Sequence, residues 1–278
     1  MTEYAYYNGV FTPYNAAVIP LSDRSIFFSD AVYDVAVGRG KMLYQRDEHL
    51  DRLYRSAALI GIENLPERSE LSDAIDELVG MFEGDEFMLY VQLSTDAERR
   101  THTREARAIN VLMTVTACEL PRELSEIKAI TLPDMRHRFC NVKTTSLLPA
   151  VLSVEEAKRR GADIAIFHKG NEVTECSYAN VAIFKGGTLI THPLDEDILP
   201  GITQLNLERA AGRRGIPRER RPFTVEELYL ADAVMVTSTT KLIKLCTEID
   251  GRAVEVSDSG VIRDLFSALR EDLYSKTD

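Results

Sequence analysis

Short runs of aromatic and β-branched residues alternate with amphipathic stretches along this chain, and that alternation restricts the fold more than any other feature. In residues 1–117, strands are predicted at 4–7, 31–37, 87–93 and 109–116, and helices at 47–60 and 71–82. In residues 126–278, strands at 127–132, 163–167, 181–184 and 233–237 alternate with helices at 149–160, 203–213 and 261–273. The pattern predicts an α+β or mixed α/β fold.

The apolar pattern is interrupted at residues 118–125, where Pro121 occurs among the charges of Glu119, Arg122 and Glu123. We expect an interdomain linker at 118–125. It would join a small α+β domain of residues 1–117 to a larger mixed α/β domain of residues 126–278. Clefts between two domains often hold ligands.

The composition argues against some classes of partner. The chain has 33 Lys and Arg against 44 Asp and Glu, so its net charge of −11 offers no basic surface for nucleic acid. No apolar run approaches the about 20 residues that a membrane-spanning helix needs, and the polar, acidic N-terminus is unlike a signal peptide. We therefore expect a cytoplasmic protein that binds neither nucleic acid nor a membrane.

Four cysteines, Cys118, Cys140, Cys176 and Cys246, are scattered along the chain. Their spacing fits neither a disulfide framework nor a zinc site. We predict mostly buried thiols and no metal centre.

A single lysine, Lys143, lies among apolar and hydroxyl residues in the segment 140–148, which reads CNVKTTSLL. The P-loop, dinucleotide-binding, zinc-protease and serine-hydrolase motifs are absent, which leaves cofactor chemistry of another kind. Burial lowers the proton affinity of an amine, and a neutral amine can form a Schiff base with an aldehyde or ketone. Taken by itself, however, such a lysine is more often a solvated strand residue.

An acid, Glu175, is embedded in a mostly uncharged polar stretch between two predicted strands. A carboxylate in such a place can keep a pyridine nitrogen protonated. Pyridoxal phosphate (PLP) chemistry requires that protonation, because the ring then withdraws electrons from the substrate Cα. A glutamate in a hairpin turn is the simpler interpretation.

Three segments have the donors that a phosphate needs: Arg52 in the first predicted helix, residues 201–203 at a helix start, and residues 237–240 after a strand. Free N–H groups at a helix start attract anions, and hydroxyls or a guanidinium complete the hydrogen bonds. Each segment has an ordinary alternative, since such threonines often cap helices and such arginines are often solvated.

The polar stretch between the strands at 87–93 and 109–116 contains residues 99–102, which read RRTH. Cationic side chains in a loop can converge on a substrate carboxylate. Solvated loop charges are again the alternative.

In this order, the segments resemble those of the class IV, or fold-type IV, PLP-dependent aminotransferases, and within that family most closely the D-amino acid aminotransferases. The resemblance spans nearly the whole chain. It rests on six segments: residues 30–35 (DAVYDV), 49–54 (HLDRLY), 142–144 (VKT), 173–175 (VTE), 199–203 (LPGIT) and 236–240 (VTSTT).

The resemblance implies a role for each matching residue. Lys143 corresponds to the Schiff-base lysine, which also moves the proton between the substrate Cα and the cofactor, and Glu175 to the partner of the pyridine nitrogen. The phosphate would be held by Arg52, Ile202, Thr203 and Thr239, with help from Ser238. Leu199 corresponds to the aliphatic residue that supports the cofactor ring.

The resemblance also implies how substrate is held. D-amino acid aminotransferases carry an Arg-x-His pair, here Arg100 and His102, that reaches the site of the neighbouring subunit and binds the substrate carboxylate together with a strand tyrosine, here Tyr33. A homodimer with PLP between its two domains is therefore expected. The implied reaction is transamination between a D-amino acid, such as D-alanine or D-glutamate, and a 2-oxo acid, 2-oxoglutarate or pyruvate.

Other functions on the same scaffold stay open. They are a branched-chain L-amino acid aminotransferase, an aminodeoxychorismate lyase and a non-catalytic PLP-binding protein. The chain departs from the D-enzyme pattern at residues 176–179 (CSYA) and 144–146 (TTS), so the resemblance leaves the substrate range undetermined.

Overall fold

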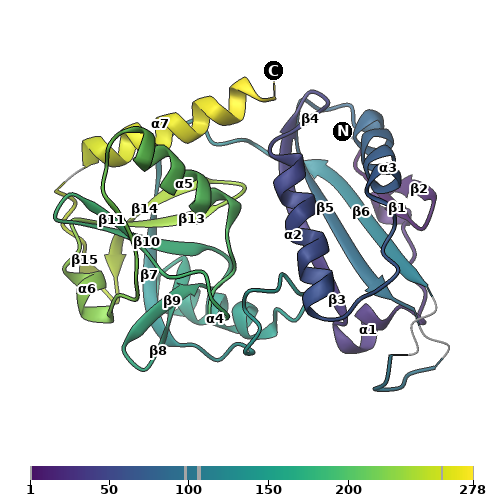
Figure 1. Cartoon of the computed structure of the whole chain (residues 1–278), viewed down its shortest axis with the longest axis horizontal. Coiled ribbons are helices and arrows are strands. Elements are labelled where there is room, and N and C mark those ends of the chain that lie inside the picture. The colour runs from purple at the N-terminus through teal and green to yellow at the C-terminus, as the bar shows by residue number, and fades with distance from the viewer. Residues whose placement is uncertain (1, 97–98, 105–107, 258, 278) are drawn as a thin grey trace. The chain divides into compact units, whose positions relative to one another are not determined.

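Figure 1 shows the computed structural model, which describes residues 2–96, 99–104, 108–257 and 259–277. The chain folds into two compact units. Unit 1 contains Met1–Leu120, Val142–Ser146 and Tyr274–Asp278, and unit 2 contains Pro121–Asn141 and Leu147–Leu273. The division differs from a single boundary near residue 120, because Val142 is buried in the core of unit 1 and brings its neighbours with it.

Unit 1 is an antiparallel sheet with two long helices on one face. The sheet has the strand order β2-β1-β6-β5-β3-β4. The elements are β1 (Tyr4–Tyr7), β2 (Val10–Pro13), a 3-10 turn (Tyr14–Ala16), α1 (Arg24–Phe28), β3 (Ala31–Arg39), β4 (Met42–Leu43), α2 (Arg46–Leu59), α3 (Arg68–Met81), β5 (Glu86–Thr95) and β6 (Ile109–Ala117).

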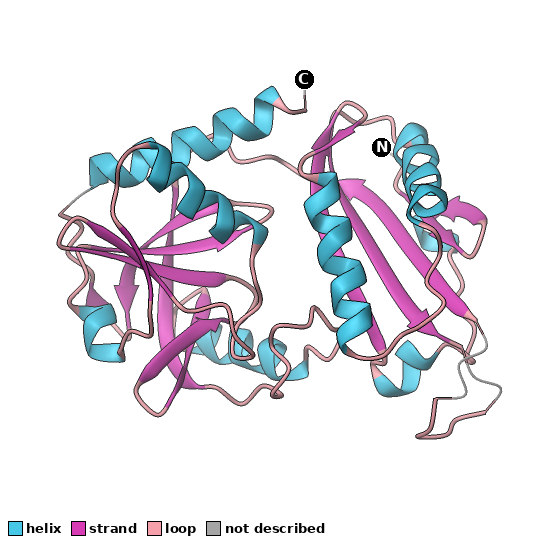
Figure 2. Ribbon diagram, viewed as in Figure 1, coloured by secondary structure: helices cyan, strands magenta, loops and turns pink. Residues whose placement is uncertain are grey.

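The core of unit 1 lies between this sheet and helices α2 and α3 (Figure 2). Alternate residues of β5, from Phe87 to Leu93, point to the helices because side chains alternate between the two faces of a strand. Helix α3 contributes a stripe that includes Leu71, Ile75 and Leu78, spaced as an amphipathic helix requires. Both helices expected from the sequence are confirmed.

Unit 2 is built on a mixed sheet with the strand order β12-β11-β10-β13-β14-β7-β8-β9, and β15 pairs with β14. Its elements are β7 (Ser125–Pro133), α4 (Leu148–Arg159), β8 (Ile164–Lys169), β9 (Glu172–Cys176), β10 (Asn180–Lys185), β11 (Thr188–Thr191), α5 (Ile202–Arg213), β12 (Arg218–Arg220), α6 (Val225–Tyr229), β13 (Ala233–Ser238), β14 (Leu242–Ile249), β15 (Arg252–Ala253) and α7 (Ser259–Ser275).

This sheet curls around one core. Val173 of β9 and Ile190 of β11, which come from strands near opposite ends of the sheet, belong to the same buried cluster. Hairpin turns lie at Gly186-Gly187, between β10 and β11, and at Asp250-Gly251, between β14 and β15. The curled sheet brings the end of β9 and the start of β10 close to the segment before α5.

Two of the longer strands of unit 2 were not among those expected. β14 was missed because Lys244, Thr247 and Glu248 interrupt its apolar residues. β9 was interpreted as part of a polar stretch, with Glu175 in a turn as the simpler alternative. That alternative is wrong: Val173 anchors the strand in the core, and the turn follows at residues 177–179. Within the described part of the chain, every helix is too short or too polar to cross a bilayer.

Candidate active site

Lys143 lies in an extended segment that pairs with the open edge of β3 in unit 1. The N–H of Tyr33 donates to the carbonyl of Lys143 at 2.9 Å, and Val32 and Thr144 form a single β-bridge. The N–H of Lys143 donates to Oγ of Ser56 on α2 at 3.2 Å. The lysine backbone is therefore fixed by both a strand and a helix.

Thr144 and Thr145, where the chain departs from the family pattern, also help to fix the segment that contains Lys143. Oγ1 of Thr144 donates to the carbonyl of Ala31 at 3.1 Å, and Oγ1 of Thr145 donates to the carbonyl of Ser29 at 3.0 Å. These two hydroxyls bind the lysine segment to the residues that precede and begin β3. Both hydroxyls have hydrogen-bond partners on the backbone, which explains how hydroxyl residues are accommodated beside Lys143.

The side chain of Lys143 lies over an aromatic ring. Its Nζ is 4.5 Å from the ring centroid of Tyr33, which in turn stacks on Tyr90 with centroids 5.3 Å apart. An ammonium at this distance is attracted by the ring face. Two predicted site residues, Lys143 and Tyr33, thus lie together.

Arg52 is buried on α2, with only 7% of its surface exposed, so the interpretation as a solvated helix residue is wrong. Its Nε and Nη2 each donate to a carboxylate oxygen of Asp34 at 2.8 Å. Asp34 also accepts from Nδ1 of His49, one turn before Arg52 on α2, at 2.7 Å. The carboxylate fixes the plane of the guanidinium through two parallel bonds.

Charges in this cluster are set by burial and pairing. Burial opposes ionisation of Asp34, but Arg52 and the hydrogen bond from His49 outweigh it and hold the pKa of Asp34 well below its usual range. Burial also lowers the pKa of His49, against the pull of Asp34. A neutral imidazole facing a carboxylate must donate from Nδ1, because an ionised carboxylate only accepts.

Arg100 and His102 contact α1 of unit 1. The guanidinium of Arg100 lies 5.1 Å from the ring centroid of Phe28, and the His102 ring meets the same phenylalanine edge-on at 5.4 Å. Arg24 holds the loop by donating from Nη1 to the carbonyl of Thr101 at 2.7 Å. The two predicted carboxylate ligands are therefore attached to a helix of their own unit, and both are exposed.

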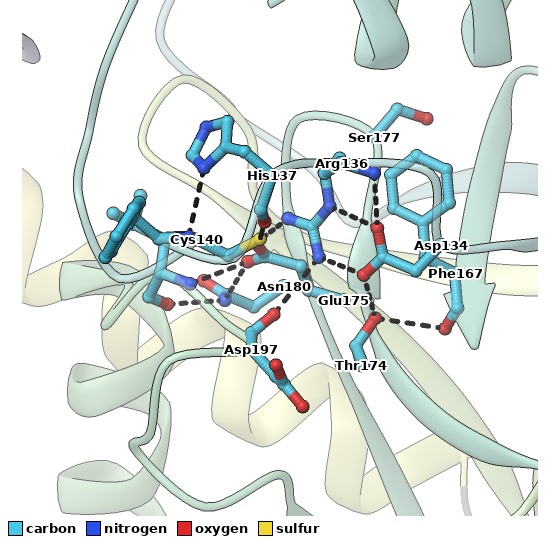
Figure 3. Close-up of polar contacts among 12 residues, drawn as sticks. Asp134, Arg136, His137, Cys140, Phe167, Thr174, Glu175, Ser177, Asn180 and Asp197 are labelled. Carbon is cyan, nitrogen blue, oxygen red and sulfur yellow. Dashed lines mark hydrogen bonds and ion pairs between the residues drawn. The ribbon is translucent and has the colours of Figure 1, made fainter. Parts of the chain in front are cut away.

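Glu175 is buried on β9 in unit 2, and its two oxygens have different partners (Figure 3). Oε1 accepts from Nη1 of Arg136. Oε2 accepts from Nδ2 of Asn180 at 2.9 Å and from the N–H of Leu199 at 3.1 Å. Two predicted residues, Glu175 and Leu199, are thus joined by a hydrogen bond.

Arg136 is itself held by Asp134. Its Nε and Nη2 donate to the two oxygens of Asp134 at 2.9 and 2.6 Å, and Nη2 also reaches the carbonyl of Asp197 at 3.1 Å. Burial disfavours the charge on each group, yet pairing lowers the pKa of Asp134 and raises that of Arg136. Burial raises the pKa of Cys140 in the same cluster to about 11, so that thiol is neutral at pH 7.

The segment before α5 approaches Asn180 closely. Nδ2 of Asn180 donates to the carbonyl of Leu199 at 2.8 Å, and a Cβ on Gly201 would overlap with Oδ1 of Asn180. Gly201 is the N-cap of α5 and has no side chain to accept bonds from the first turn. The N–H groups of Ile202 and Thr203 therefore begin a helix whose start is suited to an anion.

β13 lies beside this helix start. Thr237 is the register partner of Asn180, so the two side chains point to the same face of the sheet, and α5 packs against β13. Among the described residues, Nε2 of Gln204 in the first turn of α5 and Oγ1 of Thr237 are buried without a hydrogen-bond partner. Buried donors of this kind usually have one. Ser238 ends β13 and Thr239 begins the following turn.

Residues 176–179, where the chain departs from the family pattern after Glu175, comprise three buried residues and one exposed residue. Cys176 is buried in the core, and Oγ of Ser177 bonds to both the N–H and the carbonyl of Ala165, at 3.1 and 3.2 Å. Tyr178 is 58% exposed at the tip of the turn.

Apart from Arg100 and His102, which contact α1, the predicted site residues form two groups, one in each unit. Unit 1 brings Tyr33, Arg52 and Lys143 to β3 and α2, and unit 2 brings Glu175, Leu199, Ile202, Thr203, Ser238 and Thr239 to β9, β13 and the start of α5. Sequence reasoning missed the supporting residues Asp34, His49, Ser56, Asp134, Arg136 and Asn180. One signal was available: His49, Arg52 and Ser56 share a helix face at spacings of three and four.

Residues 31–249 match the family model described as amino-transferase class IV. The chain belongs to the class IV aminotransferases. The match extends over both groups of candidate residues, from the start of β3 to the end of β14.

Individual class IV aminotransferases match almost the full length. A D-alanine aminotransferase of Listeria monocytogenes is 35% identical over 248 residues, covering 87% of this chain and 85% of the relative. One of Bacillus licheniformis is 32% identical over 278 residues, covering 98% and 97%. The solved structure of a fold IV-transaminase from Curtobacterium pusillum superposes with a TM-score of 0.84 at 25% identity, covering 95% and 92%. The last comparison shows that the fold is that of fold-type IV enzymes.

Proposed function

We propose that this class IV aminotransferase uses PLP to move an amino group between a D-amino acid, such as D-alanine or D-glutamate, and a 2-oxo acid, 2-oxoglutarate or pyruvate. The observation that carries the substrate assignment is the similarity to two D-alanine aminotransferases over nearly their whole lengths. The six matched segments of the chain contain every residue that the resemblance assigns to the cofactor.

The side chains fit the chemistry of PLP. An amine, Lys143, lies over an aromatic ring, and a buried carboxylate, Glu175, is held by a guanidinium. A buried guanidinium, Arg52, is oriented by Asp34. We assign these three groups to the aldehyde, the ring nitrogen and the phosphate of one cofactor.

The start of α5 supports the phosphate assignment. Ile202 and Thr203 present backbone N–H groups there, and Gln204 and Thr237 are buried polar side chains with unsatisfied atoms close by. An anion at the helix start would be stabilised by the N–H groups and the helix dipole. We assign Thr239, with help from Ser238, to the same phosphate.

Lys143 carries the proton in this proposal. When bound, the cofactor supplies an aldehyde for amine exchange and an electron-withdrawing ring that acidifies the substrate Cα. Lys143 then removes the Cα proton as a general base and returns it at the other end of the conjugated system. The ring of Tyr33 stabilises the ammonium form that carries the proton, and Ser56 and Thr144 keep the lysine backbone in place.

Arg100 and His102 would bind the substrate carboxylate, in a neighbouring subunit if the enzyme is a homodimer. Phe28 and Arg24 hold their loop on α1, so the two side chains are presented from a fixed base. The homodimer stays a prediction, which gel filtration with light scattering tests directly.

A panel of paired D- and L-amino acids tests the proposed reaction. With 2-oxoglutarate as acceptor, we expect D-alanine to react at least about tenfold faster than L-alanine or L-leucine, a difference of about 1.4 kcal/mol in barrier. Pyruvate is the acceptor for the D- and L-glutamate pair, because transfer from alanine to pyruvate gives back the same two compounds. Lys143→Ala should abolish turnover. Lys128→Ala is the matched control, because Lys128 lies on the surface and pairs with Glu248.

Each other outcome selects an alternative. Equal or faster reaction of L-leucine would make the protein a branched-chain aminotransferase. Release of pyruvate from aminodeoxychorismate without any oxo-acid acceptor would make it a lyase. PLP binding without turnover of any donor would leave a non-catalytic binding protein.

A further inference from the structure

Glu175 belongs to a buried cluster of charged side chains whose other members have no part in the reaction proposed above. It consists of Asp134, Arg136 and Glu175, which we call the charge triad (Figure 3). Arg136 stands between two carboxylates, with Nε and Nη2 directed to Asp134 and Nη1 to Glu175. Its guanidinium also lies 4.9 Å from the ring centroid of Phe167.

The charge triad is shielded from solvent. The exposed fractions of the three side chains are 0% for Asp134, 12% for Arg136 and 7% for Glu175. Charges are screened weakly in such surroundings, so each one acts strongly on its neighbours. Two carboxylates and one guanidinium carry one net negative charge.

The neighbouring titratable groups leave this balance unchanged. The pKa of Cys140 is raised to about 11 by burial, so the thiol is neutral. The pKa of His137 is lowered, first by burial and then by Arg136, which favours the neutral imidazole. Lys169 and Asp197 pair with each other and add no net charge.

A guanidinium that paired with Glu175 alone would neutralise it. The carboxylate would then attract a nearby cation less, and the guanidinium would repel that cation. Asp134 removes this conflict, because its charge compensates Arg136 and leaves that of Glu175 uncompensated. Thr174 helps to hold Asp134 by donating from Oγ1 to Oδ2 at 3.0 Å.

We propose that Asp134 and Arg136 are positioning residues that, with Glu175, keep the ring nitrogen of the bound cofactor protonated by matching its single positive charge. This inference rests on the proposed function, since it takes Glu175 as the partner of that nitrogen. Arg136 bonds to both carboxylates, and Asp134 supplies the charge that offsets the guanidinium and leaves the charge of Glu175 to the ring. A protonated ring and the charge triad are together neutral, which is the arrangement a buried site tolerates best.

The test measures the protonation state of the ring nitrogen. The protein is reconstituted with PLP labelled with nitrogen-15 in the ring, and the chemical shift of that nitrogen is recorded between pH 6 and 9. In the wild-type protein and in the control Glu172→Gln, which removes an exposed charge from the same strand, we expect the shift of a protonated ring. In Asp134→Asn we expect a move toward the unprotonated value and about a tenfold lower kcat for D-alanine.

Arg136→Gln separates charge from geometry. Loss of the guanidinium leaves the cluster at least as negative as before, even if Asp134 then takes up a proton, so the charge account predicts that the ring stays protonated to at least as high a pH as in the wild type. If Arg136 only braced Glu175, the same variant would lose ring protonation, and that result would overturn the proposal. This variant decides the matter even if Asp134→Asn does not fold.

Failure of the inference is distinguishable from failure of the proposed function. An unchanged shift in Asp134→Asn, in a protein that binds PLP and transaminates D-alanine, overturns the role of Asp134 and leaves the function intact. Absence of PLP binding in the wild-type protein overturns both.

Discussion

Unit 1 and unit 2 each bury a guanidinium–carboxylate pair, but they use it in opposite ways. In unit 1, Asp34 orients Arg52, and the guanidinium is the group assigned to the phosphate. In unit 2, Arg136 orients Glu175, and the carboxylate is the group assigned to the ring nitrogen.

The supporting residues differ accordingly. Asp34 is shared with His49, which is neutral, so the cluster in unit 1 has no net charge. Arg136 is shared with Asp134, which is ionised, so the cluster in unit 2 is negative. The comparison teaches that the third member of a buried ion-pair cluster sets its net charge: a neutral imidazole leaves the cluster of unit 1 neutral, and a second carboxylate leaves that of unit 2 negative.

The largest effect is expected from Glu175→Gln, which removes the charge from the functional member of the pair in unit 2. A neutral amide cannot stabilise a protonated ring nitrogen. We expect kcat for D-alanine to fall by about 10² to 10³, or about 3–4 kcal/mol in barrier. Stopped-flow measurement of the first half-reaction checks it, and a rate within about threefold of the wild type would contradict the assignment.

Asp34→Asn breaks the support in unit 1. It leaves the buried charge of Arg52 without its carboxylate, which costs about 3 kcal/mol in the free energy of unfolding. Denaturant unfolding of the apoprotein should show this loss, and PLP affinity should fall with it because the guanidinium is no longer oriented. Unfolding curves that coincide with those of the wild type would show that Asp34 is not needed to balance Arg52.

His49 should make unit 1 sensitive to pH. Its pKa is lowered from 6.5 in the folded chain, first by burial, so below pH 6.5 the unfolded chain binds a proton that the folded chain does not. The stabilisation is therefore present above pH 6.5 and lost as pH falls, by up to about 1.4 kcal/mol per pH unit. Thermal melts from pH 8 to 5 should show a smaller decline in His49→Gln, and parallel declines would refute the role of His49.

The smallest effect is expected outside both clusters, at Lys41. Its ammonium donates to the carbonyls of Val79, Gly80 and Phe82 at 3.1, 3.0 and 2.8 Å, where α3 ends. Lys41→Met should cost about 1 kcal/mol of stability and leave kcat unchanged. A change in kcat here would show that loss of stability alone disturbs the reaction, and would weaken conclusions from the other variants.

Sequence reasoning named the groups that we propose to carry chemistry, but not the groups that support them. Lys143, Glu175 and Arg52 stand in segments with a recognisable order, and amphipathic spacing predicted the helix that carries Arg52. Asp134 and Arg136 both come from the loop that follows β7, and meet Glu175 only because the mixed sheet curls. No local pattern encodes that meeting.

Burial was the other property that the sequence did not reveal. A lone arginine in an amphipathic helix is usually solvated, and Arg52 is buried only because Asp34 lies opposite it on β3. Likewise, β9 contains two glutamates and an exposed start, so its strand character depends on Val173 reaching the core. In both cases, contacts with residues distant in the sequence decide whether the segment is buried.

The central claim is that the amine of Lys143 is the attachment point of the cofactor, and borohydride trapping tests it most directly. The protein is incubated with PLP, reduced, digested and mapped by mass spectrometry. The account predicts one pyridoxyl phosphate adduct, on the peptide that contains Lys143, and its loss in Lys143→Ala but not in Lys128→Ala. An adduct on another lysine, or none, would contradict it.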